Sequence, residues 1–107
     1  MVDEQCPLPP DLAGIEVVIL KPDPELGGYP QAVALANGEA AMRFEEYLLI
    51  SWYDRDRDFE SPPNTTECPK ACEKNGYILY ALSHGATLKV DIEGGRFVFF
   101  YTPVVWD

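Results

Sequence analysis

A chain of 107 residues with eight Lys and Arg against eighteen Asp and Glu carries a formal charge of −10. This balance disfavours nucleic-acid and anionic-membrane partners, because both are bound mainly by basic side chains that neutralise phosphate. The length suits one domain, and no apolar run approaches the roughly 18 residues of a membrane span.

The N-terminal segment, MVDEQCPLPP, is acidic and rich in proline. It is unlike a secretory signal, so we expect a cytoplasmic protein of one domain, residues 1–107, with residues 1–12 as an extended arm. The next stretch, Ile15–Lys21, predicts a strand because it is rich in β-branched residues. Since Val17–Leu20 is apolar on both faces, we expect this strand inside the sheet rather than at its edge.

The following stretch predicts one ambiguous element and one long helix. Gln31–Ala36 suits a short strand or the start of a helix, and we favour the strand because Asn37 and Gly38 interrupt a continuous helix. Asn37 is instead a suitable N-cap for a helix over Asn37–Tyr53. That helix would carry an apolar stripe and an i,i+4 ion pair. The stripe comprises Ala41, Phe44, Leu48 and Trp52, and the pair is Glu39 with Arg43.

A polar segment follows the long helix, beginning with DRDRD at residues 54–58. Pro69 favours the first turn of a second, short helix over Pro69–Asn75, which Gly76 would end. A competing interpretation extends this helix to His84 with Gly85 as its cap. We favour a strand after Gly76, as the first of a β-meander over residues 76–101.

The C-terminal quarter is expected to supply most of the core. Its middle strand alternates, with Leu88, Val90 and Ile92 on one face, and a tight turn follows at Glu93-Gly94-Gly95. With the two helices this indicates an α+β fold. We predict a two-layer sandwich with a mixed or antiparallel sheet of about four or five strands, one long helix and one short helix.

The last strand, RFVFFY, is apolar on both faces, and Trp106 adds further apolar surface. Helices on one side would leave much of it uncovered, and exposed apolar patches usually mark interfaces. We therefore expect homodimerisation through Phe97, Phe99, Tyr101 and Trp106. In two alternatives, the N-terminal arm or a loop covers the strand, or the strand lines a hydrophobic groove. The first functional hypothesis is a small acidic, non-enzymatic binding or assembly module that recognises a protein or a small ligand.

Three cysteines support a second hypothesis, a thiol protein. In a cytoplasmic chain they are expected to be free thiols. Cys68 and Cys72 lie one turn apart at the start of the short predicted helix, and Lys70 and Lys74 flank Cys72. A helix N-terminus and nearby cations stabilise a thiolate. Cys72 would then be the active group, with Cys68 or Cys6 resolving; the competing interpretation is that these side chains simply pack.

Two motifs resemble TusA-type sulfur-carrier proteins. TECPKACEKNGY, followed by strands that end in RFVFFY, resembles their second helix and closing strands, and CPLP at Cys6–Pro9 resembles their CPxP signature. The resemblance implies sulfur or thiol relay through Cys6 or Cys72. The order departs from that family, in which CPxP follows the first strand and opens the first helix.

Neither a metal nor a cofactor is expected. The cysteines and His84 could form a Cys3His zinc site, but their spacing lacks a CxxC-type pair. DRDRD matches the first positions of a calcium loop, yet Phe59 and Thr65 occupy the positions that require Gly and Glu. No nucleophile elbow accompanies Ser51 or Ser83, so an enzymatic role is the less favoured one.

Overall fold

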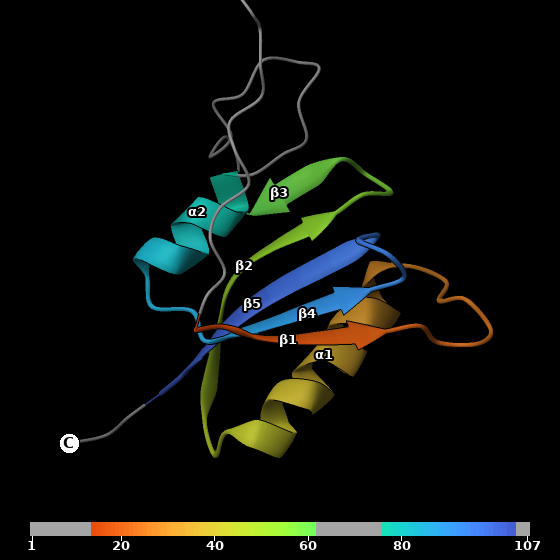
Figure 1. Cartoon of the computed structure of the whole chain (residues 1–107). Coiled ribbons are helices and arrows are strands. Elements are labelled where there is room, and N and C mark those ends of the chain that lie inside the picture. The colour runs from red at the N-terminus through yellow and green to blue at the C-terminus, as the bar shows by residue number, and fades with distance from the viewer. Residues whose placement is uncertain (1–13, 62–75, 105–107) are drawn as a thin grey trace, which may run out of the picture.

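The computed structural model describes residues 14–61 and 76–104, which form five strands and two helices (Figure 1). In chain order these are β1 (Glu16–Leu20), α1 (Tyr29–Arg43), β2 (Tyr47–Asp54), β3 (Phe59–Ser61), α2 (Gly76–Ser83), β4 (Leu88–Ile92) and β5 (Phe97–Pro103). No helix in this described part is long and apolar enough to cross a bilayer. The predicted N-terminal arm and the predicted helix Pro69–Asn75 lie outside the described residues.

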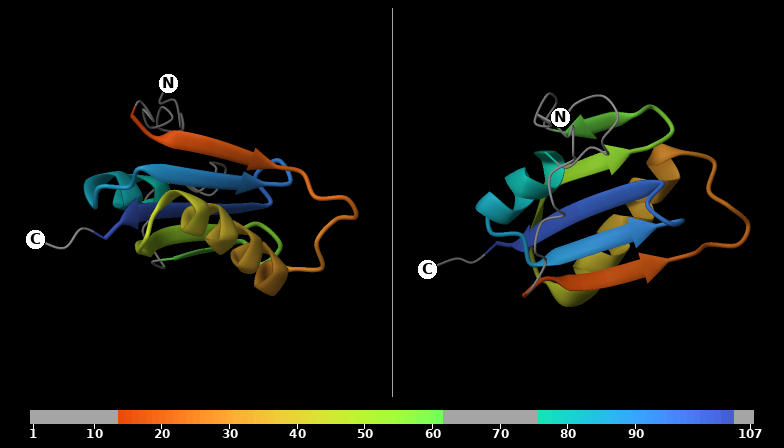
Figure 2. Two further views of the ribbon diagram at one scale, coloured as in Figure 1. Left: turned by 90° about the horizontal axis from the view of Figure 1, so that it is seen from below. Right: turned by 45° about the horizontal axis from the view of Figure 1, so that its top comes forward.

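The strands form one mixed sheet in the order β1-β4-β5-β2-β3 (Figure 2). β1 runs parallel to β4, with Val18 opposite Val90, and the other neighbouring strands are antiparallel. The predicted α+β class and mixed sheet are confirmed. The first strand lies where it was predicted, but its expected place inside the sheet is wrong, because β1 is an edge strand. The apolar side chains of Val17 and Ile19 are exposed rather than covered.

Helix α1 begins directly after Gly28, with Pro30 in its first turn, where a missing amide N–H costs nothing. Its buried stripe consists of Ala32, Ala36 and Ala40, all completely buried, and these small side chains allow close approach to the sheet. The predicted strand Gln31–Ala36 is therefore wrong, and Asn37 is no N-cap. Asn37 lies within the helix and accepts a hydrogen bond of 2.6 Å from the Tyr101 hydroxyl.

The predicted helix Asn37–Tyr53 is also wrong, because α1 ends at Arg43 and Tyr47–Asp54 is strand β2. Steps of three and four residues between apolar side chains do not separate a helix from a strand that is apolar on both faces. In that predicted stripe Leu48 is in fact exposed. The predicted pair of Glu39 and Arg43 is confirmed at 3.0 Å, since both residues lie in α1.

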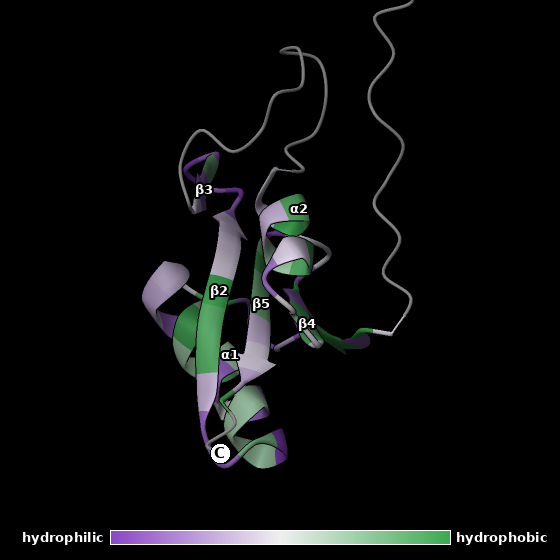
Figure 3. Cartoon of the chain, turned by 90° about the vertical axis from the view of Figure 1, so that its left-hand side faces the viewer, coloured by the Kyte–Doolittle hydropathy of each residue, from purple (hydrophilic) through white to green (hydrophobic). Residues whose placement is uncertain are grey.

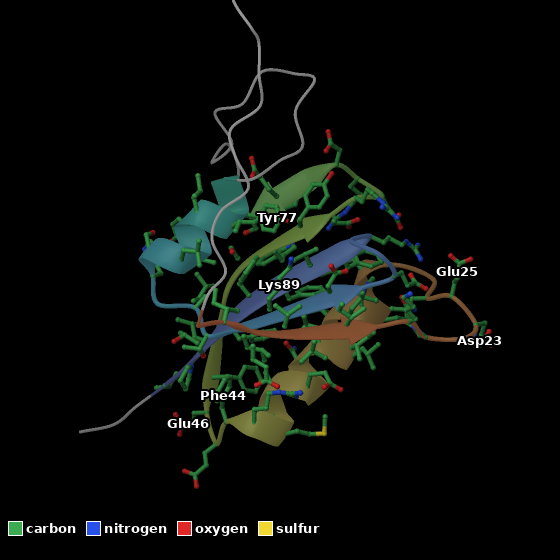
Figure 4. All side chains as sticks on the ribbon, in the orientation of Figure 1. Asp23, Glu25, Phe44, Glu46, Tyr77 and Lys89 are labelled. Carbon is green, nitrogen blue, oxygen red and sulfur yellow. The ribbon has the colours of Figure 1, made fainter. Side chains whose placement is uncertain are left out.

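The two helices lie on opposite faces of the sheet, as Figure 3 shows on either side of β2 and β5. α1 and the sheet form the larger sandwich, with Phe97, Phe99 and Tyr101 among the core residues between them. α2 covers part of the other face, where Val98 and Phe100 pack with Tyr77 (Figure 4). The doubly apolar strand β5 is thus covered on both faces. The alternating set Leu88, Val90 and Ile92 is completely buried against α1, as expected.

Helix α2 occupies Gly76–Ser83, for which a strand was favoured, so that strand is wrong and the competing helical interpretation is confirmed for these residues. Gly85 has φ +83°, the left-handed conformation that glycine adopts readily at a helix end. The amide of Ala86 donates to the carbonyl of Ala81, and that of Gly85 to the carbonyl of Leu82, which is the Schellman arrangement. The predicted turn after β4 is confirmed, with Glu93, Gly94 and Gly95 all at positive φ.

Candidate functional site

A pocket of about 350 Å³ lies where the chain enters α1 and where it leaves β2. Its walls come from Gly28, Tyr29 and Pro30 on one side and from Asp54, Asp56 and Arg57 on the other. The start of α1 and the turn between β2 and β3 lie at the same end of the sheet (Figures 1 and 2). The pocket therefore joins a helix N-terminus to a charged hairpin turn.

Arg57 is held in place by a buried carboxylate. Asp54 is 1% exposed, and its Oδ2 accepts a 2.6 Å hydrogen bond from the Nε of Arg57. The guanidinium lies 5.3 Å from the centroid of the Tyr29 ring and 5.5 Å from that of Phe59, which gives it two cation–π contacts. Among the described residues, the two terminal amino groups of Arg57 have no hydrogen-bond acceptor. They remain available to a ligand.

Tyr29 forms the other wall of the pocket. Burial raises the pKa of its hydroxyl, an effect that Arg57 opposes and Asp54 reinforces. The hydroxyl is therefore protonated at neutral pH. The Tyr29 ring also contacts Trp52 and Phe99, with centroid distances of 5.9 and 6.0 Å, which anchors this wall to the core.

The first turn of α1 adds further donors to the pocket. The residue that caps it is Gly28, which has no side chain to accept from the free amides, and the turn contains no acidic residue. Unsatisfied amides and the helix dipole give such a terminus a partial positive charge. Pro30 has no N–H and the Ala32 amide donates to the Gly28 carbonyl, so Tyr29 is the lining residue of this turn whose amide could serve a ligand.

A second arginine fixes the loop that leads into α1. Arg96 donates to Asp56 at 2.6 Å, to Glu93 at 2.8 Å and to the carbonyl of Leu26 at 2.9 Å. Glu93 in turn accepts from the amide of Leu26 at 3.1 Å. The hydrogen bonds from Arg96 lower the pKa of the Asp56 carboxyl and raise that of the guanidinium. Both pocket carboxylates are thus engaged with an arginine, Asp54 with Arg57 and Asp56 with Arg96.

The candidate residues expected from the sequence lie outside this pocket. Phe97, Phe99 and Tyr101 are 0% exposed, so the interface predicted at these side chains is wrong: they form the core under α1. Trp106 and the candidate thiols Cys6, Cys68 and Cys72 lie outside the described residues, and the thiol hypothesis stays a prediction. His84 is exposed at the end of α2, stacked on Tyr80 with a centroid distance of 4.0 Å.

The pocket residues were missed as a site. The sequence places DRDRD in a polar segment after a long helix, whereas Asp54 ends β2 and residues 55–58 form the turn to β3. Two sequence features could have indicated this site. One is GGYP at residues 27–30, a helix start without a capping side chain, and the other is the Asp- and Arg-rich segment 54–58 after an apolar run. Within residues 14–61 and 76–104, no three His, Cys, Asp or Glu side chains gather as metal ligands.

Residues 15–101 match the family described as domain of unknown function DUF5619. The chain belongs to this family. Among solved structures, the DUF5619 chain is similar to AF1514 from Archeoglobus fulgidus DSM 4304, with 19% identity and a TM-score of 0.69. That likeness covers 87% of this chain and 99% of AF1514, and at this identity it shows a shared fold. No curated protein matches the chain.

Proposed function

We propose that this DUF5619 chain is a non-enzymatic binding module whose pocket takes a small anionic ligand. The ligand class is a carboxylate or phosphate group on a small apolar body. One observation carries the proposal, the way in which the Arg57 side chain is held. Its Nε donates to the buried Asp54, so its two terminal amino groups remain available to a ligand in the pocket. A guanidinium prepared in this way suits the two oxygens of a carboxylate or phosphate.

Local charge supports an anion in spite of the net charge of −10. Asp54 and Asp56 are each paired with an arginine, which offsets their repulsion of an anion. The uncapped first turn of α1 contributes the Tyr29 amide and the positive end of the helix dipole, both of which favour an anion. The groups left for a ligand are therefore mainly hydrogen-bond donors: Arg57, the Tyr29 amide and the protonated Tyr29 hydroxyl.

Size and protonation favour binding over catalysis. A volume of about 350 Å³ lies at the lower end of the range of small-molecule sites, and Tyr29 with Pro30 offers an apolar wall for the body of the ligand. A general base works best with a pKa near the operating pH. Here the Asp56 carboxyl has a lowered pKa and the Tyr29 hydroxyl a raised one, so neither is tuned for proton transfer near pH 7.

Isothermal calorimetry with phenyl phosphate, benzoate and inorganic phosphate tests the proposal. Replacement of Arg57 with Gln removes a charged hydrogen-bond donor, and we expect at least about tenfold weaker binding of phenyl phosphate, since such bonds contribute ~1.5–3 kcal/mol. The matched control is Arg55→Gln, which makes the same charge change at a neighbouring exposed residue that does not line the pocket.

The controls separate a specific site from general attraction. The proposal is supported if phenyl phosphate binds the natural chain and Arg55→Gln alike and binds Arg57→Gln more weakly. Equal weakening of phenyl phosphate binding in both variants would show that the ligand responds only to the net charge of the chain, and it would contradict a site at Arg57. No saturable binding of any of the three probes at millimolar concentration would refute the proposal.

A further inference from the structure

The outer edge of β1 presents hydrogen-bonding groups of the backbone to solvent. The ladder to β4 begins with the Glu16 amide donating to Thr87 and ends with Leu20 accepting from the Glu93 amide. In a parallel pair, alternate residues direct both backbone groups to the same neighbour. The backbone groups that bond to β4 are therefore those of Glu16, Val18 and Leu20. The N–H and C=O groups of Val17 and Ile19 point outward, away from β4. Within the described part of the chain, no strand lies beyond this edge (Figure 2).

The side chains of the same two residues are apolar and exposed. Val17 is 44% and Ile19 63% exposed, on the face opposite α1. α2 does not shield them, because it packs on β2, β3 and β5. Proteins usually protect an edge strand with proline, a bulge, an inward charge or a very short strand. β1 has neither a proline nor a bulge over its five residues, EVVIL, and its one charged residue, Glu16, pairs with Arg43 of α1 at the start of the strand, whereas β3 at the other edge is only three residues long.

We propose that β1 pairs with β1 of a second copy of this chain in an antiparallel register centred on Val18. The two copies then form one continuous sheet. Val17 of each copy lies opposite Ile19 of the other, and each of these two pairs exchanges two backbone hydrogen bonds, about four in all. This register overlaps the whole of Glu16–Leu20, whereas a shift by two residues in either direction leaves strand residues unpaired.

Charge supports a second copy as the occupant of this edge. Chains of −10 repel one another over most of their surface. The charges along β1 and β4 are balanced, because Glu16 and Asp91 are matched by Lys89 and the adjacent Lys21. Lys89, labelled in Figure 4, lies beside Val17, and Asp91 lies beside Ile19. In the proposed register, Lys89 and Val17 of one copy therefore lie on one line across the sheet with Ile19 and Asp91 of the other copy.

This surface replaces the dimer interface expected at the C-terminal strand, and it is independent of the pocket. β1 is separated from β2 by β4 and β5, and the pocket lies on the far side, between β2 and α1. Both pockets remain open in the pair. Failure of ligand binding and failure of dimerisation are therefore separate outcomes.

Sedimentation equilibrium on the full chain in reductant tests the pairing. We expect a mass of twice 12.0 kDa for the natural sequence and a shift to the single-chain mass for Ile19→Lys. The matched control is Leu79→Lys, the same charge change at an exposed apolar residue of α2, 52% exposed, which should remain dimeric. A natural chain that stays monomeric up to millimolar concentration overturns the proposal, as does a dimer unaffected by Ile19→Lys.

A cross-link tests the register, in a background with Cys6, Cys68 and Cys72 changed to Ser. Val18 would lie opposite its own counterpart in a non-hydrogen-bonded pair, with Cα atoms about 4.5 Å apart, which suits a disulfide. Val18→Cys is thus expected to form a covalent dimer under mild oxidation faster than Val17→Cys. Faster cross-linking through position 17 would overturn the register.

Discussion

Replacement of Phe99 with Ala distinguishes a core residue from an interface residue. Phe99 is 0% exposed in the central strand, and its ring centroid lies 6.0 Å from that of Tyr29, which walls the pocket. The substitution removes most of a buried aromatic ring and leaves a cavity between the sheet and α1. If Phe99 instead contacted a partner chain, the change would lower the particle mass and leave the fold of the single chain nearly unaffected.

The expected loss in the free energy of unfolding is about 3–5 kcal/mol, the usual range for truncation of a fully buried Phe to Ala. For a domain of this length, 1 kcal/mol corresponds to roughly 4 °C in Tm, so we expect Tm to fall by about 12–20 °C. That loss is a large part of the total stability of a small domain, which is about 5–15 kcal/mol.

Urea unfolding followed by circular dichroism measures the loss at a fixed protein concentration. Leu48→Ala is the control, because it shortens an apolar side chain of the adjacent strand that is 57% exposed. It should cost no more than about 0.5 kcal/mol. A loss below about 1 kcal/mol for Phe99→Ala would refute the placement of β5 under α1.

Three further predictions concern the charged turn, the buried tyrosines and the thiols. Asp54→Asn removes the buried carboxylate that pairs with Arg57. We expect the free energy of unfolding to fall by ~1 kcal/mol, because solvent screens the charge of the exposed Arg57 side chain and weakens the pair. Arg57→Gln should abolish most of this effect in a double-mutant cycle, whereas strict additivity would show that the two residues do not interact. Burial and the hydrogen bond to Asp58 raise the pKa of Tyr53 to about 12, and burial also raises that of Tyr101. Because the unfolded tyrosines release their protons from about pH 10 upward while the folded ones retain them, stability should be complete below about pH 10 and fall between about pH 10 and 12. Urea titrations across that range check this, with a shallower fall expected for Tyr53→Phe and a flat profile contradicting it. If Cys72 is a working thiol, it should react with a maleimide at neutral pH faster than Cys6 and Cys68, and equally slow reaction of all three would exclude the thiol relay.

Local patterns predicted the elements whose chemistry is self-contained. The β-branched run of β1, the alternation of Leu88, Val90 and Ile92, and the glycine turn after Glu93 each need only neighbouring residues for their interpretation. The Glu39–Arg43 pair was found for the same reason, since it requires only a helical spacing of four.

Other elements depend on tertiary packing. Tyr47–Asp54 is apolar at positions that suit either a helix or a strand, and its pairing with β5 decides for a strand. Asn37 interrupts the helical pattern in the sequence. Within α1 its side chain is satisfied by a hydrogen bond from the Tyr101 hydroxyl, which is 64 residues away in the chain. The burial of β5 on both faces follows from the position of α2 on the face opposite α1, which periodicity does not indicate.

The pocket was missed because its two walls are distant in the sequence. Gly28 and Tyr29 meet Asp54 and Arg57 only when β2 returns along the sheet beneath α1. The sequence shows the charges of DRDRD but not that Asp54 is buried while Arg57 reaches over Tyr29. Burial and contact between segments, rather than residue type, make this turn a candidate site.

The most direct test of the binding site is a titration of the ¹⁵N-labelled natural chain with phenyl phosphate, followed by two-dimensional NMR. Saturable shifts are expected only in the amides of the α1 start, residues 28, 29, 31 and 32, and of the turn, residues 54–57. The exposed loop residue Glu25, which does not line the pocket, should shift little (Figure 4). Saturable shifts centred elsewhere, or shifts that grow linearly without saturation, would contradict a ligand site at Arg57.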